Sequence, residues 1–444
     1  MTNSMISEAT AHQQPYRPPD VPVRSAILSG LLVLVPALVF LNRGIVWPLM
    51  YGRQMQDPSG LYGGLGLYAP HTLHKIWFPL LTTITLSLFA VARIQQPNYN
   101  KYYITYWGLF FAWSTISLFW AIEPSIAFSR LTLQMLVAIC LYLAFCGTDR
   151  PKQILNCVFF VVIMSVFINL LAVLTQEPTA LGHNGIFQHK NKLGVFSVLA
   201  MLLVLLKLGD GRRYLPIALI SLPACIYMLI LSQSKTSFGL VFVALLAGAV
   251  VALFAKGLRI PASFTFILGG IAVFLLSAVI FAVLGFSFTQ QLETVTGDAT
   301  FTGRTALWSF AWDYVEAQPW IGYGFRSFWQ IGENTPSLSL GFGFIATAAH
   351  GHNGYIDILL GGGIIAVLLV IPILIISLNL CGNIAKKSLY EGFVLASFVI
   401  FVLLHNMFET TLLFGVNVVF VLFQIVWLYM VYTVNDDPSK ASRL

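Results

Sequence analysis

The chain has 444 residues, of which 58% are hydrophobic and only 9% are charged, and its mean hydropathy is +0.82. An ordinary soluble domain carries roughly 25% charged residues, so this composition excludes that class. The formal net charge of +7 would suggest nucleic acid as a partner for a soluble protein. In so apolar a chain the placement of the basic residues matters more, and no nucleic-acid partner is expected.

Apolar runs recur along the chain, each about as long as a helix that crosses a bilayer. Inside lipid every backbone polar group must be satisfied internally, which leaves helices or a closed barrel. The runs are too continuous for the alternating strands of a barrel, so the sequence predicts an all-α polytopic membrane protein. The twelve predicted spans lie near residues 26–41, 76–92, 102–122, 126–146, 153–175, 193–209, 214–232, 237–254, 264–285, 354–380, 391–409 and 411–432.

The spans divide the chain into five parts. We expect a disordered tail over 1–25, nine spans within 26–285, a large loop over 286–353, three spans within 354–432 and a short tail over 433–444. The first segment is polar and proline-rich, without the apolar core or cleavage site of a signal peptide. The five cysteines have no C-x-x-C spacing, and we interpret them as small buried hydrophobic residues.

The distribution of Lys and Arg predicts the orientation. With the N-terminus in the cytoplasm, 15 of the 24 basic residues lie on the cytoplasmic side, and every loop there is short. Short loops are where the positive-inside rule is informative. Both termini are therefore expected in the cytoplasm, and the loop 286–353 is expected to face outward.

The remaining basic residues gather at the outer ends of the spans, where orientation does not explain them. Ionisable groups at membrane depth are costly, so they are candidates for a functional site, although Lys and Arg also extend to lipid headgroups for packing reasons alone. His405 and Glu409 lie at the same predicted depth. The nine outward basic residues are Arg43, Arg53, Lys75, Arg130, Lys190, Lys192, Lys235, Arg304 and Arg326.

The large loop is predicted to contain a short amphipathic helix. Thr302 is a suitable N-cap, and Pro319 ends the helix. Its apolar face would consist of Trp308, Ala311, Trp312 and Val315. We expect this helix to lie in the membrane interface over the bundle. Glycines in PWIGYGF indicate a turn, and HGHNGY is expected at the start of the tenth span.

Three motifs in this order, FTGRTALW, QPWIGYGF and HGHNGYIDILL, with FQHKNKLG and SKTS upstream, resemble the O-antigen ligase and Wzy-type polysaccharide polymerase family. Within it the chain is most similar to the exopolysaccharide polymerases of the ExoQ type. The chain departs from the family pattern in two places. Lys235 stands where members often have Arg, and Gly361 stands where many have an acidic residue, so any role of that acid is in doubt here.

The resemblance implies transfer of an oligosaccharide from an undecaprenyl-pyrophosphate carrier to an acceptor sugar, on the periplasmic side of a bacterial inner membrane. A departing pyrophosphate needs positive charge, for which Arg304 and then Lys235 are the first candidates. His352 matches the family histidine and suits a catalytic base. The other candidate substrate-binding residues are Arg130, Lys190, Arg326, Asn191 and Asn353.

Several of these residues also allow structural interpretations. His352 could cap the tenth span, His189 could be structural, Asn191 could mark a loop-to-helix turn, and Glu409 could only position a cation. A metal site of His350, His352 and Asp357 is a weaker alternative, since a lone H-x-H is a poor metal signal. We therefore predict no metal and no cofactor.

The leading hypothesis is an inner-membrane glycosyltransferase that polymerises lipid-linked repeat units without a metal. Its expected partners are the lipid-linked donor, a saccharide acceptor, membrane lipids and other polysaccharide assembly and export proteins. The alternatives are a ligase that hands a glycan to lipid A-core or another acceptor, and a polysaccharide transporter or flippase. A typical twelve-span transporter has two similar halves, often joined by a long cytoplasmic linker, which the short GDGRR connection does not provide.

Overall fold

The computed structural model describes residues 23–51, 72–92, 100–148, 150–284, 304–329, 335–341, 343–413 and 415–435. The described segments are helices joined by turns, and their one β interaction is an isolated bridge between Thr179 and Gly182. Residues 1–22 and 436–444 of the predicted tails 1–25 and 433–444, together with Arg53 and Thr302, lie outside the described residues. The predicted all-α architecture is confirmed.

The helices follow the apolar runs of the sequence. In chain order the α-helices are α1 (Val23–Leu32), α2 (Val35–Leu41), α3 (Trp47–Tyr51), α4 (Thr72–Val91), α5 (Gly108–Ile116), α6 (Pro124–Cys146), α7 (Pro151–Thr175), α8 (Lys190–Leu208), α9 (Leu215–Leu231), α10 (Lys235–Gly257), α11 (Ala262–Leu284), α13 (Arg304–Ala317), α14 (Pro336–Ser339), α15 (Phe344–Thr347), α16 (Gly354–Lys387), α17 (Leu389–His405) and α18 (Val418–Asn435). Shorter helical turns are η1 (Asn42–Val46) and η2 (Tyr103–Trp107), both π-helical, and η3 (Ser117–Trp120) and η4 (Arg212–Tyr214), both 3₁₀.

Within the described chain, eight helices are long and apolar enough to cross a membrane: Ile27–Met50, Pro124–Cys146, Pro151–Thr175, Lys190–Leu208, Arg212–Leu231, Lys235–Gly257, Ala262–Val283 and Gly354–Lys387. Three shorter apolar helices are Lys75–Val91, Leu389–His405 and Val418–Val434. The protein is thus a polytopic membrane protein. The first span is longer than expected, because η1 and α3 continue it through GIVWPLMY.

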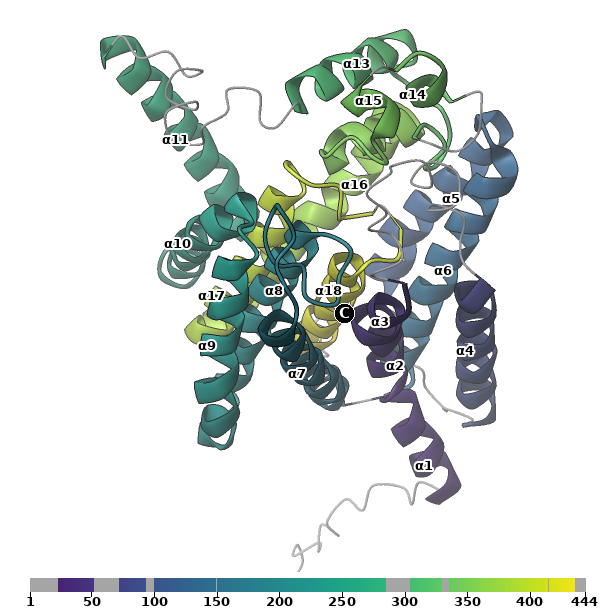
Figure 1. Ribbon diagram of the computed structural model, residues 1–444. Helices are drawn as coiled ribbons and strands as arrows, with labels where there is room; N and C mark the ends of the chain where they lie inside the picture. The colour runs from purple at the N-terminus through teal and green to yellow at the C-terminus, as the bar shows by residue number, and fades with distance from the viewer. Residues whose placement is uncertain are drawn as a thin grey trace, which may run out of the picture.

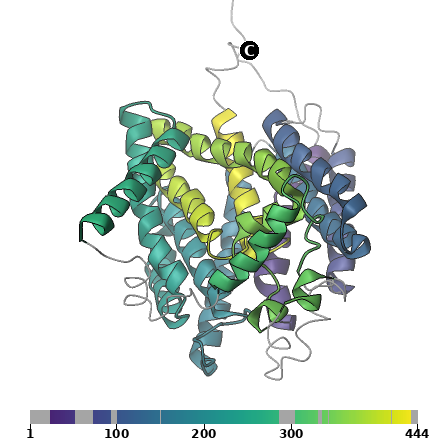
Figure 2. The same ribbon diagram turned by 90° about the horizontal axis from the view of Figure 1, so that it is seen from above.

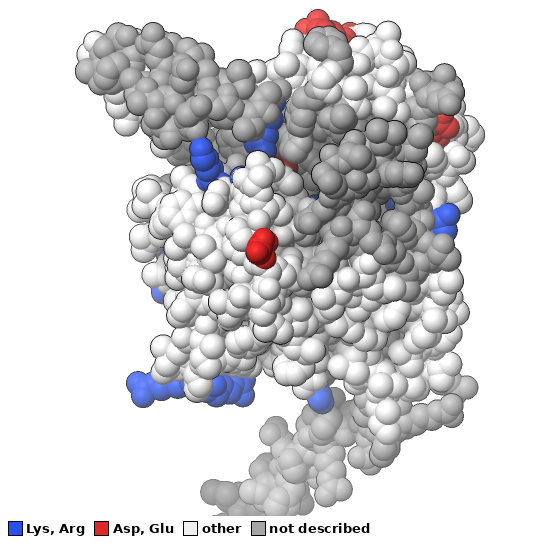
Figure 3. Space-filling view, viewed as in Figure 1, with Lys and Arg blue, Asp and Glu red and all other residues white. Residues whose placement is uncertain are grey.

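The centre of the bundle is made by α17 and α18, whose side chains are almost all buried. By contrast, α11 projects away from the other helices (Figure 1), and its most apolar stretch has no buried residue. A helix that is apolar all round and yet exposed is stable only in lipid, which fits a membrane span. Arg212 and Arg213 in η4 are exposed and follow the C-terminal end of α8, at the end of the bundle opposite Lys190. Figure 3 shows basic side chains gathered at the lower edge of the molecule.

Three predicted spans differ from the structure. The span predicted at 102–122 is divided among η2, α5 and η3 and is not among the apolar helices named above. α18 starts only at Val418, and residues 406–413 and 415–417 are not helical, where the sequence predicted a helix from residue 411. α16 extends to Lys387 and is kinked at Gly363, whose φ is +67°. At the kink the PWIGYGF turn supplies the missing helical acceptors: the Ile364 amide donates to the Pro319 carbonyl at 2.8 Å. The Trp113 indole donates to the Gly362 carbonyl at 2.9 Å. The kink therefore joins the outer loop to the bundle.

Replacement of Gly363 by Ala is expected to destabilise the protein by about 1–3 kcal/mol, since a non-glycine residue is strained at positive φ. A Cβ there would also lie 2.1 Å from the Trp320 carbonyl. Thermal unfolding in detergent would measure the loss. Gly361→Ala is the matched control, because its Cβ would meet no atom closer than 3.6 Å. Equal melting temperatures for the two variants would contradict this account of the kink.

Helices α13, α14 and α15 form a layer over one end of the bundle (Figures 1 and 2). The inward face of α13 consists of Leu307, Ala311 and Val315, which pack on Phe328 and Trp329. The helix predicted in the loop is present, but Trp312 was wrongly assigned to its apolar face. Its side chain is 48% exposed, and its indole donates to the Glu316 carboxylate at 2.7 Å.

Candidate functional site

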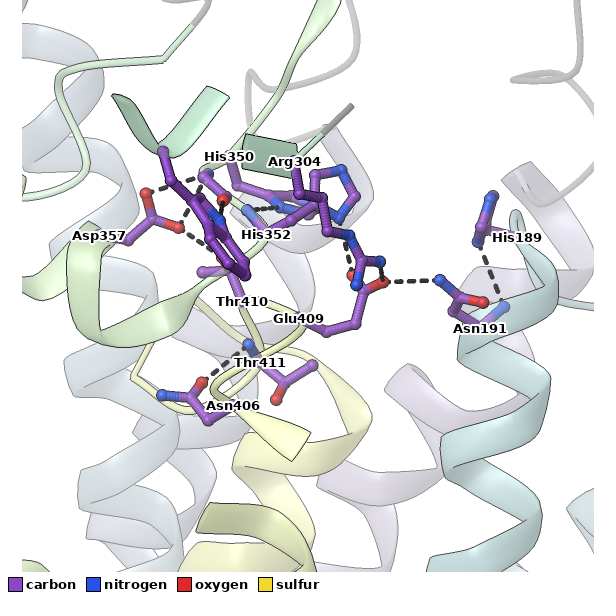
Figure 4. A network of polar contacts seen from close by, with 12 residues as sticks. His189, Asn191, Arg304, His350, His352, Asp357, Asn406, Glu409, Thr410 and Thr411 are labelled. Atoms are coloured by element: carbon purple, nitrogen blue, oxygen red, sulfur yellow. Dashed lines mark hydrogen bonds and ion pairs between the residues drawn. The ribbon is translucent and has the colours of Figure 1, made fainter. Parts of the chain in front are cut away.

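A single buried carboxylate, Glu409, joins three segments that are far apart in the sequence (Figure 4). Arg304, the first residue of α13, donates to Glu409 Oε1 at 2.6 Å. Asn191 in the first turn of α8 donates its amide to the same oxygen at 2.6 Å. His352 Nδ1 lies 3.1 Å from the other oxygen, Oε2. The carboxylate thus holds an arginine and an imidazole at one point.

His352 is held in a strained turn. Its φ is +48°, a left-handed conformation that few residues other than glycine adopt. Its backbone amide donates to His350 Nδ1 at 3.2 Å, and the centroids of the two imidazole rings lie 4.3 Å apart. Strain of this kind persists where surrounding contacts determine the conformation, and it is common at functional sites. The turn fixes the ring of His352 toward Glu409.

Asp357 supplies those surrounding contacts. Its carboxylate accepts the Gly351 amide at 3.1 Å and the Trp329 indole at 2.6 Å, and it also accepts the Thr410 hydroxyl. The Trp308 indole donates to the Gly351 carbonyl at 2.9 Å. Asp357 therefore ties the HGHN turn to the outer layer and to the residue that follows Glu409.

The charges around Glu409 determine its protonation. Burial alone would raise the pKa of Glu409, but the hydrogen bond to His352 and the charges of His352 and Arg304 hold this pKa well below its usual range. Burial and the nearby His352 lower the pKa of His350 to about 3. At neutral pH the site therefore contains an ionised Glu409 and a neutral His350.

The start of α8 lies beside this carboxylate. The His189 side chain caps α8, because its Nδ1 accepts a hydrogen bond from the backbone amide of Asn191 at 3.2 Å. The structural interpretation of His189 therefore fits the geometry. Burial lowers the pKa of His189, the charge of Glu409 opposes this shift, and the charges of Lys192 and Lys190 add to it. Both lysines therefore lie near the site.

Lys190 and Lys235 form a second cationic group next to the first. They begin α8 and α10, and their charges interact. The Lys190 ammonium lies 3.4 Å from the Gln233 carbonyl. The helix starts approach closely because Gly194 has no side chain: a Cβ there would lie 2.6 Å from Ser234. In Figure 3 basic side chains lie in the recess between α11 and the outer layer.

Arg130 and Arg326 contact one another apart from this group. The buried Arg130 guanidinium in α6 donates to the Arg326 carbonyl at 2.7 Å. Arg326 has a φ of +49°, and its side chain fills the space beside Gly415, where a Cβ would lie 2.2 Å from Nη1. Arg326 and Asp357 also line a cavity of about 30 Å³, enough for one water molecule. These contacts give both arginines a structural explanation.

Asn353 is the N-cap of α16. Its side-chain oxygen accepts the amides of Tyr355 at 3.0 Å and Ile356 at 3.3 Å. An Asn in this position satisfies the unpaired amides at a helix start. The cap on the tenth span is thus Asn353 and not His352, and the role of Asn353 in substrate binding stays a prediction.

Asn353→Ala should therefore lower stability by about 1 kcal/mol, the usual cost of losing an N-cap. Asn353→Asp should retain both stability and activity, because a carboxylate caps equally well. Melting temperature and the donor KM would be measured for both variants. A large loss of activity in Asn353→Asp at unchanged stability would mean that the amide binds substrate.

Among the described residues, one group could hold a metal ion. Ligand atoms of His350, His352 and Glu409 lie within 4.8 Å of one another. The alternative that used Asp357 as the third ligand is therefore wrong about that residue. Two imidazoles and a carboxylate are a set that zinc accepts. In the present arrangement Arg304 occupies one oxygen of Glu409.

The structure thus brings together Arg304, His352 and Asn191, with Lys190 and Lys235 nearby, while Arg130, Arg326 and Asn353 make structural contacts. Sequence reasoning gave Glu409 only the role of positioning a cation and did not predict that it would join three segments. Its one signal was an acidic residue four positions after His405, at the end of an apolar run.

Comparison with known families identifies part of the chain. Residues 216–371 match the family model described as O-antigen ligase. The matched segment runs from α9 into the first half of α16 and includes Lys235, Arg304 and His352. A comparison with curated proteins gives no match. The motif resemblance is confirmed at the level of the family, and the narrower ExoQ-type similarity stays a prediction.

Proposed function

Because residues 216–371 match the family model described as O-antigen ligase, we propose that this chain is a glycosyltransferase that polymerises undecaprenyl-pyrophosphate-linked oligosaccharide repeat units of an exopolysaccharide or surface polysaccharide. The observation that carries the proposal is the convergence of Arg304 and His352 on Glu409. A cation and an imidazole held by one carboxylate suit the displacement of an anionic leaving group by a hydroxyl.

In the proposed reaction an acceptor hydroxyl attacks the anomeric carbon of the donor sugar. The Glu409 carboxylate can only accept a hydrogen bond, so Nδ1 of His352 donates to it and Nε2 is the ring nitrogen that can take up a proton. As the new bond from oxygen to carbon forms, Nε2 takes the hydroxyl proton, and the bond from carbon to the pyrophosphate oxygen breaks. The lipid pyrophosphate leaves with both bonding electrons, and attack from the opposite side inverts the anomeric centre.

The leaving pyrophosphate is proposed to lie against the cations at the starts of α8, α10 and α13. Arg304 provides a planar guanidinium that can bind two phosphate oxygens, and Lys190 and Lys235 provide point charges. Positive charge placed in advance where negative charge develops lowers the barrier. Arg130 and Arg326 have a smaller role in this proposal, because their contacts hold the outer turn.

The protein is proposed to lie in a bacterial inner membrane with both termini in the cytoplasm. The exposed Arg212 and Arg213 at the end of the bundle opposite the site support this orientation by the positive-inside rule. The site then faces the periplasm, where lipid-linked repeat units would be available.

A ligase that transfers a glycan to lipid A-core or another acceptor is the second candidate, because the matched family is described as O-antigen ligase. Both reactions use the same donor and differ in the acceptor. Complementation of a strain that lacks the gene separates them. Polymer accumulating on the lipid carrier without a ligated product supports the polymerase, whereas single repeat units on another acceptor support the ligase. The match to the O-antigen ligase family favours the polymerase and the ligase over a transporter.

We expect transfer to survive EDTA, because the positive charge that the leaving group needs comes from side chains. Purified protein would be treated with EDTA and assayed for release of the pyrophosphate lipid. Loss of activity that Mg²⁺, Mn²⁺ or Zn²⁺ restores would contradict metal independence and would turn attention to His350, His352 and Glu409 as ligands.

A further inference from the structure

Arg43 is an outward basic residue that the proposed reaction leaves without a role. It lies in η1, a single π-helical turn within the first span. Insertions of this kind cost regular hydrogen bonds and are frequent at functional sites. The Arg43 guanidinium lies 5.3 Å from the centroid of the Trp47 ring, which provides a cation–π contact.

Buried polar side chains of α7 fix this π-turn. The Ser165 hydroxyl donates to the Gly44 carbonyl at 2.8 Å, and the Asn169 amide donates to the Ser165 carbonyl at 2.9 Å. Both side chains are completely buried. A buried polar group is costly unless it is fully bonded, so this network determines one position for the turn.

The same network holds the loop that leads into α8. The Ile186 amide donates to the side-chain oxygen of Asn169 at 3.1 Å. Gly185, with a φ of +58°, fits against that oxygen, where a Cβ would lie only 2.4 Å away. One pair of α7 side chains therefore fixes both the turn that carries Arg43 and the loop that ends in Lys190 and Lys192.

Gly44, which Ser165 holds, follows Arg43 in the chain. Gly185 contacts both Asn169 and Leu193, the residue after Lys192. The network thus places Arg43 and Lys192 close enough for their charges to interact, and the charge of Lys192 also acts on Glu409. Lys192 further bonds the Gln188 side chain. Like charges held together near membrane depth repel, and an anion between them would offset the repulsion. The rigid network keeps them together in the absence of a ligand.

We propose that Arg43 and Lys192 bind one phosphate of a pyrophosphate group, while the cations at the starts of α8, α10 and α13 bind the other. Arg43 would then set the affinity for the donor without touching the reacting sugar. The proposal rests on the proposed function for the identity of the donor, but the anion site can be tested separately. It also gives the N-terminal span, which lies outside the segment matched to the family, a part in the site.

The test uses full-length protein in lipid nanodiscs and inorganic pyrophosphate as the probe, with binding measured by calorimetry. Loss of one charge-assisted contact should weaken binding roughly tenfold to a hundredfold in Arg43→Gln. Lys75→Gln is the matched control, since Lys75 is a predicted outward cation at the start of α4, and its affinity should equal that of the wild type. Wild-type affinity in Arg43→Gln, or no pyrophosphate binding by the wild type, would overturn the proposal.

Two further arms separate the possible failures. In the transfer assay Arg43→Gln should raise the donor KM by a similar factor and change kcat by less than about threefold. The variant loses a contact that stabilises the bound donor and the transition state equally. If the wild type transfers no glycan but Arg43→Gln still weakens pyrophosphate binding, the proposed function fails and the anion site stands. If Arg43→Gln does not fold, the affinity of Lys192→Gln for pyrophosphate is measured instead. Wild-type affinity in Lys192→Gln would overturn the proposal that Arg43 and Lys192 bind one phosphate together.

Discussion

Glu409→Gln is expected to reduce the rate of glycan transfer by at least about a hundredfold. Breaking a buried ion pair leaves the partner charge uncompensated, at a cost of about 3–5 kcal/mol. Here the loss would release both Arg304 and His352, since one carboxylate holds them. Initial rates with a lipid-linked donor would measure the effect.

The stability of the same variant should depend less on pH. The pKa of Glu409 is lowered in the folded protein, so its carboxylate contributes stability above the unfolded pKa of about 4.3. That contribution is lost as the pH falls through the folded pKa, so the wild type should lose more stability below about pH 4 than Glu409→Gln. Glu316→Gln is the matched control, because Glu316 is exposed on α13 and its carboxylate accepts a hydrogen bond only from the Trp312 indole among the contacts described above, away from Glu409. Equal activity in the two variants would contradict the role of Glu409.

His352→Ala is expected to reduce transfer by roughly a hundredfold to ten-thousandfold, the usual contribution of a general base. Because His352 has a φ of +48°, Ala also adds backbone strain. His352→Asn separates the two effects, since Asn tolerates the left-handed region but is not a base. Both variants should be inactive, with Asn the more stable.

Release of the pyrophosphate lipid in single-turnover assays would be the measure for both His352 variants. His183→Ala provides a control, because His183 in the 176–189 loop is bonded through its backbone amide to the Leu231 carbonyl. Recovery of activity in His352→Asn would mean that backbone geometry, and not the imidazole, is what the site requires.

Much of the fold follows from the sequence. Long apolar runs such as that of α7 specify membrane helices directly, because lipid leaves the backbone no other way to satisfy its polar groups. The kink at Gly363 could not be predicted, since it depends on acceptors from the Pro319 turn more than 40 residues away. The outward position of Trp312 also depends on tertiary packing, which leaves Leu307 and not the larger ring facing the core.

The site could be predicted only in part. Arg304 and His352 stand in motifs, but the sequence offered His352 as the cap of the tenth span, and the cap is the next residue, Asn353. The joining of three segments by Glu409 could not be predicted, because helical periodicity does not reveal which loops meet at the end of a bundle. The π-turn at Arg43 likewise depends on Ser165, a residue in another span.

The central claim is that Arg304, His352 and Glu409 form one catalytic centre. Purified protein reconstituted with a synthetic undecaprenyl-pyrophosphate oligosaccharide tests it most directly, by following chain growth and release of the pyrophosphate lipid together. We predict that the wild type yields both products in equal amounts and that Arg304→Ala, with the protein still folded, yields neither. Chain growth by Arg304→Ala at the wild-type rate would contradict the claim.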